Sequence, residues 1–376
     1  MKLVTSLLSS VMALFLVVAI ASCNENNKEK EKVSISDDWQ VLEHQLDSLF
    51  ENKFKPDEPG LAVLVAYDGN KIFSKGYGLR DLDTKEPLTP MSNMELASVS
   101  KQFTALAILS LVNQDKISLS DTLFKFFPYE TFKNVSILEV INHTSGLDDA
   151  EAYFSSHWDS TKIANNTDVL NWYIDKNKKV GHTDKMFMYN NGTYELLPLV
   201  VEKVSGRKYP DFIKEYVFDK AGMTRTIAYD LNNPVKIDER AAYYHKDSLG
   251  DWQKMDGHPL TGLFGAGGIY TSLDDYFKYD NALKNKTILN KELHDLIFKP
   301  TSTEIPDNDK QDYAMGWFVT DSLAQHSGGW FGVNTFTRRY LNKPLTLVFF
   351  ANRDDLDKEL ISLTNSIVKS RLKKRP

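Results

Sequence analysis

The chain has 376 residues, of which 42% are hydrophobic, enough for the core of one large domain or two small ones. Its net charge is −6, and this acidic balance argues weakly against nucleic acid as a partner. It contains one cysteine, Cys23, so a disulfide bond within the chain is excluded.

The first residues are typical of a secretory signal peptide. Lys2 precedes an uncharged segment with an apolar centre at residues 11–20, and the segment ends in Ile-Ala-Ser-Cys, as in a bacterial lipoprotein cleavage box. We therefore expect residues 1–22 to be removed, Cys23 to carry a lipid anchor, and residues 23–38 to form a solvated tether. The mature protein would be membrane-anchored in the cell envelope, facing the periplasm or the exterior. The alternative for Cys23 is an unpaired thiol.

The residues after the tether predict a helix and then a hairpin. Trp39, Leu42, Leu46 and Phe50 recur at helical spacing. An apolar strand at 61–67, the turn Asp68-Gly69 and a returning strand at 71–78 follow.

The rest of the chain predicts a helical middle and a strand-rich end. Helices are expected at 136–142, 168–176, 194–204, 211–220, 274–283 and 354–371, and strands at 313–320, 324–327, 335–340 and 345–351. Strands at both ends predict an α+β fold, in which an antiparallel β-sheet is flanked by helices and carries an inserted, mainly helical subdomain. We assign one folded domain to residues 39–376. Its sheet subdomain comprises about 39–105 and 255–376, and the helical insertion about 106–254.

Ser98 and Lys101 are the first residues that carry chemistry. They form a Ser-x-x-Lys pair before an apolar run at 104–112, and positions three apart lie on one face of a helix. A serine hydroxyl becomes a good nucleophile when a neighbouring base takes its proton, and burial favours the neutral form of a lysine that acts as this base. The backbone N–H of Ser98 could also form half of an oxyanion hole.

The Ser-x-x-Lys pattern is weak evidence alone, because it also starts at Ser205, Ser366 and Ser370. Those three lie in charged segments, whereas the run after Ser98 is apolar nearly all round, as in a buried helix. The structural alternative for Ser98 is an N-cap serine beside a solvated lysine. Ser145 is a weaker candidate nucleophile, because it follows a predicted helix in a glycine turn.

Tyr189 and Asn191 form a second polar motif, Tyr-Asn-Asn-Gly. In the functional interpretation the Tyr189 phenol exchanges a proton with Lys101, and Asn191 donates a hydrogen bond to a substrate carbonyl. The alternative is an ordinary half-buried tyrosine. Tyr-x-Asn also occurs at 279 and 340, so the pattern is not specific alone.

A third motif, His-Ser-Gly-Gly at 326–329, is expected at a strand end. Its glycines allow close approach of a ligand, and the Gly329 N–H could be the second oxyanion donor. His326 would bind substrate, although a histidine satisfied by its neighbours is the alternative. The histidines show no metal-binding spacing and no Gly-x-Ser-x-Gly motif occurs, so we expect no metal or other cofactor and no α/β-hydrolase.

Taken in order, these motifs resemble those of the serine β-lactamase and penicillin-binding protein superfamily, in the branch of class C β-lactamases, D-aminopeptidases and related esterases. The resemblance covers about residues 40–370 and includes the segments at 98–101, 143–147, 189–192, 266–270, 315–317 and 326–329. It implies an acylated Ser98, proton transfer by Lys101 and Tyr189, and substrate positioning by Asn191. The N–H groups of Ser98 and Gly329 would form the oxyanion hole, and residues 143–147 a structural turn.

One position departs from the β-lactamase pattern. His326 stands where Lys-Thr-Gly usually supplies a cation for the substrate carboxylate. An imidazole with an ordinary pKa of about 6.5 is mostly neutral at pH 7.5, so it would be a weak carboxylate anchor. We therefore expect substrates with a free carboxylate to bind better as the pH falls from about 8 to 6.

The sequence thus predicts an exported serine hydrolase that acts by acyl transfer on an ester, an amide or a D-amino-acid peptide. The substrate would be a small molecule or peptide, such as one derived from the cell wall. The alternatives are a true β-lactamase or DD-carboxypeptidase, and a non-catalytic protein that binds muropeptides or β-lactams. Ser98, Lys101 and Tyr189 argue against the last. Segments 148–166 and 247–259 are expected to line the cleft.

Overall fold

The computed structural model of the chain describes residues 35–175, 186–301, 305 and 311–372. The predicted signal peptide and the predicted lipid-attachment residue Cys23 lie outside the described residues. The first helix begins at Ile35, so the last four residues of the predicted tether are helical. Of the helices in the described part, none combines the length and the apolar character needed to cross a membrane.

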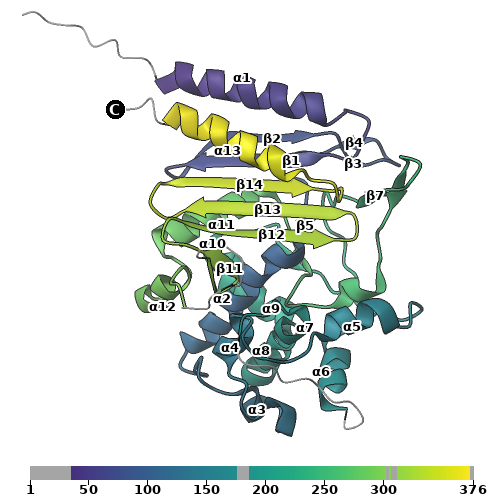
Figure 1. Ribbon diagram of the computed structural model, residues 1–376, viewed down its shortest axis with the longest axis vertical. Coiled ribbons are helices and arrows are strands. Elements are labelled where there is room, and N and C mark those ends of the chain that lie inside the picture. The colour runs from purple at the N-terminus through teal and green to yellow at the C-terminus, as the bar shows by residue number, and fades with distance from the viewer. Residues whose placement is uncertain (1–34, 176–185, 302–304, 306–310, 373–376) are drawn as a thin grey trace, which may run out of the picture.

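A seven-stranded antiparallel sheet forms the centre of the molecule (Figure 1). Its strands lie in the order β10-β11-β12-β13-β14-β1-β2, so the first strand of the chain lies between the last strand and its own hairpin partner. Leu61 pairs with Ala351, and Tyr67 with Leu345. The prediction of one antiparallel sheet built from both ends of the domain is confirmed. The strands are β1 Leu61–Tyr67, β2 Asn70–Tyr77, β10 Asp312–Ala314, β11 Trp317–Val319, β12 Leu323–Trp330, β13 Val333–Tyr340 and β14 Leu345–Ala351.

Both faces of the central strands are covered, which explains why β1 and β14 are almost continuously apolar. Val63 and Phe349 pack against α1 (Ile35–Lys53) and α13 (Lys358–Leu372), which lie side by side over one face (Figure 1). Leu64 and Phe350 belong to the larger core on the other face.

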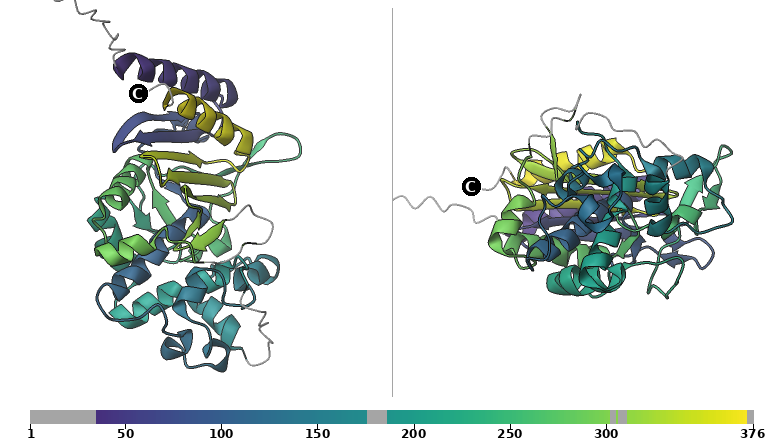
Figure 2. Two further views of the ribbon diagram at one scale, coloured as in Figure 1. Left: turned by 60° about the vertical axis from the view of Figure 1, so that its left-hand side comes forward. Right: turned by 90° about the horizontal axis from the view of Figure 1, so that it is seen from below.

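The helices from the middle of the chain lie on the opposite side of the sheet from α1 and α13 (Figure 2). Those predicted at 136–142, 168–176, 194–204 and 211–220 are present, with ends shifted by a few residues. Ser136 caps α4 by a reciprocal hydrogen-bond pair with Glu139, and Gly222 ends α10 in the left-handed conformation. The helices are α2 Lys101–Val112, α3 Leu123–Phe126, α4 Ile137–Ile141, α5 Ala150–His157, α6 Asn166–Ile174, α7 Asn191–Tyr194, α8 Leu197–Ser205, α9 Tyr209–Ile213, α10 Asp219–Ala221, α11 Leu273–Asn285 and α12 Lys291–Leu296. The subdomain boundaries stay a prediction.

The prediction of a single strand at 313–320 is wrong in one respect. It is two short strands, β10 and β11, separated by a turn at Met315 and Gly316, which both have positive φ, +47° and +85°. A Cβ on Gly316 would lie 2.6 Å from the backbone nitrogen of Gln102. The chain therefore turns where it packs against the start of α2, a tertiary contact that strand periodicity does not encode.

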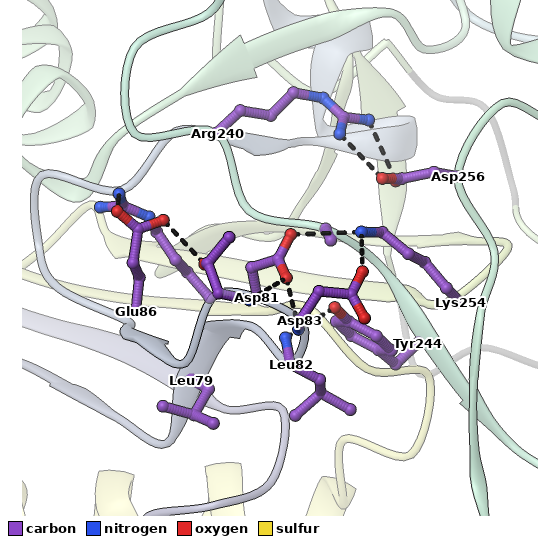
Figure 3. Close-up of polar contacts among 12 residues, drawn as sticks. Leu79, Asp81, Leu82, Asp83, Glu86, Arg240, Tyr244, Lys254 and Asp256 are labelled. Atoms are coloured by element: carbon purple, nitrogen blue, oxygen red, sulfur yellow. Dashed lines mark hydrogen bonds and ion pairs between the residues drawn. The ribbon is translucent and has the colours of Figure 1, made fainter.

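Polar contacts join the short strands that lie outside the central sheet. Lys254 donates to both Asp81 and Asp83, and so ties the β7–β8 hairpin to the β3–β4 ribbon (Figure 3). Arg240 donates two parallel hydrogen bonds to Asp256, at 2.9 and 3.0 Å, in the same region (Figure 3). The short strands are β3 Leu79–Asp81, β4 Glu86–Pro87, β5 Met94–Glu95, β6 Ile227–Ala228, β7 Tyr244–Lys246, β8 Trp252–Lys254 and β9 Ile269–Thr271.

Candidate active site

Ser98 lies in a short 3-10 turn, Ala97–Ser100, that leads directly into α2. Ala97 has φ +47°, a left-handed conformation that costs a residue with a side chain about 1 kcal/mol or more. Leu96 holds the turn from two sides, because its N–H donates to Ile269 O in β9 at 2.8 Å and its carbonyl accepts from Thr335 Oγ1 in β13 at 2.7 Å. The turn that carries Ser98 is therefore fixed by two strands.

Gly328 in β12 lets the sheet lie against this turn. A Cβ at that position would lie 2.3 Å from Thr335 Oγ1 and 2.4 Å from Leu96 O, closer than side chains tolerate. The first glycine of the His-Ser-Gly-Gly motif thus has a packing role beside the nucleophile turn.

Lys101 is the first residue of α2 and is completely buried. Its Nζ lies within hydrogen-bond distance of three oxygens: Ser98 Oγ at 3.1 Å, Asn191 Oδ1 at 2.7 Å and Ala266 O at 3.2 Å. Nζ also lies 4.8 Å from the centre of the Tyr189 ring. The four residues predicted to act together lie together, and the contact between Lys101 and Tyr189 is with the face of the ring.

The segment that carries Tyr189 and Asn191 is anchored by its neighbours. Asn190 donates from its backbone N–H to His143 Nδ1 at 3.1 Å and from its side chain to Leu147 O at 2.7 Å. Its Oδ1 accepts from the backbone of α7. The segment 143–147 therefore has a supporting position, as the family resemblance implied. Ser145 Oγ accepts a hydrogen bond from Leu147 N–H, the geometry of a local turn.

The Asn191 amide links Lys101 to an acidic residue. Because the Glu151 carboxylate only accepts, the amide atom that faces it is Nδ2, which donates to Oε1 at 2.7 Å, and the amide oxygen faces Lys101. From the sequence, we expected this amide to donate a hydrogen bond to a substrate carbonyl. One of its two N–H groups is already engaged, so one remains for a substrate.

The structure corrects the expectation for His326. Its ring is 2% exposed, Nδ1 lies 2.6 Å from Ser327 O, and Nε2 lies 3.0 Å from Tyr313 Oη. A carbonyl only accepts, so Nδ1 carries the proton and Nε2 accepts from the tyrosine. Burial, together with the charge of Lys101, lowers the pKa of His326 to about 3. His326 is therefore a neutral side chain with both nitrogens engaged, and it does not become charged between pH 8 and 6.

A cavity of about 130 Å³ opens above Ser98. Predicted residues Ser98, Asn191 and Gly329 line it, so both proposed oxyanion donors belong to its wall. The described residues that line it are Glu95, Ala97, Ser98, Glu151, Asn191, Leu260, Thr261, Leu263, Ala266, Gly267, Gly329 and Trp330. Within this described set there are two carboxyl side chains and no lysine, arginine or histidine.

A second cavity of about 430 Å³ shares Thr261 and Trp330 with the first. Its walls are rich in aromatic side chains, and the Arg240–Asp256 pair seen in Figure 3 belongs to them. Of the two segments predicted to line a cleft, 148–166 contributes Glu151 to the small cavity. Segment 247–259 contributes Met255, Asp256 and Gly257 to the larger one.

The acidic residues of the site were not predicted from the sequence. Glu95 is buried and accepts from Gly268 N–H at 3.3 Å, and burial raises its pKa to about 7. Glu151 and Glu195 are also buried. For Glu195, the available signal was a charged residue directly before the apolar run at 196–201 of the predicted helix. Over the described residues, no group of three or more His, Cys, Asp or Glu side chains is arranged to hold a metal ion.

Comparison with known sequences gives a family match along most of the chain. The family model described as Beta-lactamase matches residues 46–368. The chain is 32% identical over 325 residues to penicillin-binding protein 4* of Bacillus subtilis (strain 168), an alignment that covers 82% of this chain and 72% of that protein.

Two solved structures share the fold. The octameric penicillin-binding protein homologue from Pyrococcus abyssi superposes with a TM-score of 0.75 at 22% identity, over 90% of this chain and 79% of that one. The D-amino acid amidase from Ochrobactrum anthropi SV3 superposes with a TM-score of 0.72 at 21% identity, over 89% of this chain and 98% of that one. At these identities the comparison shows the fold alone, which is the predicted α+β class.

Proposed function

The chain belongs to the beta-lactamase family, and from this we propose that it hydrolyses an ester, an amide or a D-amino-acid peptide through an acyl-enzyme on Ser98. The observation that carries the proposal is the position of the buried Lys101 Nζ, 3.1 Å from Ser98 Oγ at the base of a cavity. A nucleophile with a base in hydrogen-bond reach is the arrangement that acyl transfer requires.

In the proposed reaction, neutral Lys101 accepts the Ser98 proton while Oγ attacks the substrate carbonyl carbon. The N–H groups of Ser98 and Gly329 stabilise the charge that develops on the carbonyl oxygen. Collapse of the tetrahedral intermediate breaks the bond to the alcohol or amine. That leaving group takes the proton back from Lys101, with Tyr189 beside it, and an acyl ester remains on Ser98. Water then attacks this ester by the same steps and releases the acid.

The charges of the site favour a neutral or cationic substrate over an anionic one. The small cavity carries the carboxyl groups of Glu95 and Glu151, and His326 is buried and neutral. A neutral imidazole with both nitrogens engaged offers no charge-assisted hydrogen bond to a carboxylate. Esters and amides without a carboxylate beside the scissile bond are therefore better candidates than β-lactams.

A labelling experiment tests the nucleophile. A fluorophosphonate serine probe should label the wild-type protein and the Ser145→Ala variant equally, and should not label Ser98→Ala. Turnover should be screened on p-nitrophenyl esters, D-amino-acid amides, muropeptides and a chromogenic cephalosporin. Full activity in Ser98→Ala would show that Ser98 is the wrong residue. A folded protein that is neither labelled nor active would favour the non-catalytic binding alternative.

A β-lactamase or DD-carboxypeptidase is the second candidate. It is favoured by the 32% identity to a protein named as a penicillin-binding protein. Faster turnover of the cephalosporin or of a D-alanyl peptide than of any ester in the screen would support it.

The location proposed for this activity is the cell envelope. The support is the segment before Cys23, which resembles a lipoprotein signal. A lipid anchor there would hold the hydrolase at a membrane surface, where cell-wall fragments are available as substrates.

A further inference from the structure

Two buried carboxyl groups lie behind the Asn191 amide. Glu151, in the first turn of α5, accepts from Asn191 Nδ2 at 2.7 Å and is 8% exposed. Glu195 directly follows α7 and is completely buried. Neither oxygen of Glu195 has a hydrogen-bond donor among the described residues, and the group within hydrogen-bonding reach of it is the Glu151 carboxyl.

Two adjacent buried carboxylates cannot satisfy each other, because both only accept hydrogen bonds. A hydrogen bond between them needs one proton, and two like charges in a buried site favour holding that proton. Burial, with the charge of Glu151 added, raises the pKa of Glu195 well above its ordinary value. Burial also raises the pKa of Glu151, whereas its hydrogen bonds from Glu195 and Asn191 and the charge of Lys101 lower it. The proton therefore belongs on Glu195.

We propose that Glu195 remains protonated and donates a hydrogen bond to an ionised Glu151, and that this single negative charge orients the Asn191 amide, whose oxygen then holds Lys101 Nζ beside Ser98. The inference rests on the proposed function. Glu151 and Glu195 are positioning residues in it, because they act on Ser98 through Asn191 and Lys101. The series of side-chain contacts runs from Glu195 to Glu151, Asn191, Lys101 and Ser98.

Three other groups face the pair, from α5, α6 and α2. Asp149, at the start of α5, is acidic, and its oxygens accept from the backbone N–H groups of Asn191, Gly192 and Glu151. Tyr173 from α6 donates its hydroxyl to Asp148 O at 2.8 Å, and burial raises its pKa well above 10, so it is neutral. Lys101 from α2 faces the pair through the Asn191 amide, whose oxygen lies 2.7 Å from Nζ.

Two isosteric variants test this charge assignment through the pH profile of kcat/KM. The acidic limb of this profile reports protonation of the group that must accept the Ser98 proton. Glu151 is joined to Lys101 through one amide, by two hydrogen bonds of 2.7 Å. Removing the Glu151 charge disfavours an added proton at that separation, which moves the limb by about one to two pH units. In Glu151→Gln the acidic limb should therefore move to lower pH by about that amount.

Glu195→Gln should leave the limb in place, because a neutral amide N–H can replace the donor and Glu151 keeps its charge. The matched control is Glu292→Gln, on the exposed side of α12, which should not move the limb either. Equal shifts of the acidic limb in Glu151→Gln and Glu195→Gln would mean that both carboxyl groups are ionised in the wild type. No shift in either variant would mean that neither is ionised. Either result overturns the proposal.

An infrared measurement separates this proposal from the proposed function. At about pH 8.5 the wild-type protein should show a protonated carboxylic acid band that is lost in Glu195→Gln and unchanged in Glu292→Gln. If no substrate is turned over, or if Ser98→Ala stays active, the proposed function fails. The infrared band alone then decides whether Glu195 is protonated. If Glu195→Gln does not fold, the wild-type band and the Glu151→Gln profile decide it. Absence of the wild-type band overturns the proposal.

Discussion

Replacing Gly328 by alanine should damage both stability and activity, because β12 lies against the turn that carries Ser98. The new Cβ would lie 2.3 Å from Thr335 Oγ1 and 2.4 Å from Leu96 O, so β12 or the turn must move by roughly 1 Å to restore ordinary contact. Overpacking of this kind costs about 1–3 kcal/mol. For a domain of this size that lowers the Tm by about 1–4 °C. A displacement of about 1 Å near the nucleophile should lower kcat/KM about 100-fold.

The adjacent glycine is the control for this experiment. A Cβ on Gly329 would meet Asn334 Nδ2 at 3.6 Å, an ordinary contact, so Gly329→Ala should change the free energy of unfolding by less than about 0.5 kcal/mol. Unfolding followed by circular dichroism and kcat/KM on the best ester should be measured for both variants. Wild-type stability in Gly328→Ala, or equal destabilisation by the two substitutions, would refute the packing argument.

Three further predictions concern single residues. Ser98→Ala and Lys101→Ala should each lower kcat by about 1,000-fold or more without unfolding the domain. The double variant should be scarcely less active than either single variant, because the effects of residues that act as one unit do not add. Additive losses in kcat would contradict this. His326 has a pKa of about 3 in the folded protein, against about 6.5 in the unfolded chain. Between these pH values the unfolded state binds more protons than the folded state. The contribution of neutral His326 to the free energy of unfolding is therefore complete above about pH 6.5 and is lost as the pH falls. The free-energy difference between wild type and His326→Gln should therefore shrink by about 1–3 kcal/mol from pH 7 to pH 4, and a constant difference would rule this out. Cys23→Ser should release a soluble or unprocessed form in the native host, whereas intact mass analysis that shows an unmodified Cys23 thiol would end the lipoprotein assignment.

The elements with strong local signals were predictable from the sequence. The apolar run at 61–67, followed by the Asp68-Gly69 turn, indicates the β1–β2 hairpin. Apolar residues at helical spacing from Trp39 to Phe50 indicate α1. The Ser98–Lys101 contact follows from three-residue spacing on a helical turn, and it is present at 3.1 Å. These predictions need only residues that are close in the chain.

The environment of His326 was not predictable, because its partner Tyr313 comes from a different strand and burial removes the ring from solvent. The Glu151–Glu195 pair likewise brings together the start of α5 and the end of α7, which are far apart in sequence. Periodicity shows which face of an element is buried, but it does not show which polar side chains meet there. Distances between such groups depend on packing, which a single sequence does not state.

The central position of β1 in the sheet has a consequence for how the chain folds. Gly60 N–H donates to Asn352 Oδ1, 292 residues further along, and β1 pairs with the last strand, β14, along its whole length. The sheet can therefore close only after nearly the entire chain has emerged from the ribosome. Until then β1 and β13 present unpaired edges, which favour aggregation. Nonsense or frameshift changes before residue 345 remove a central strand, so such shortened chains should accumulate as proteolysed or insoluble material.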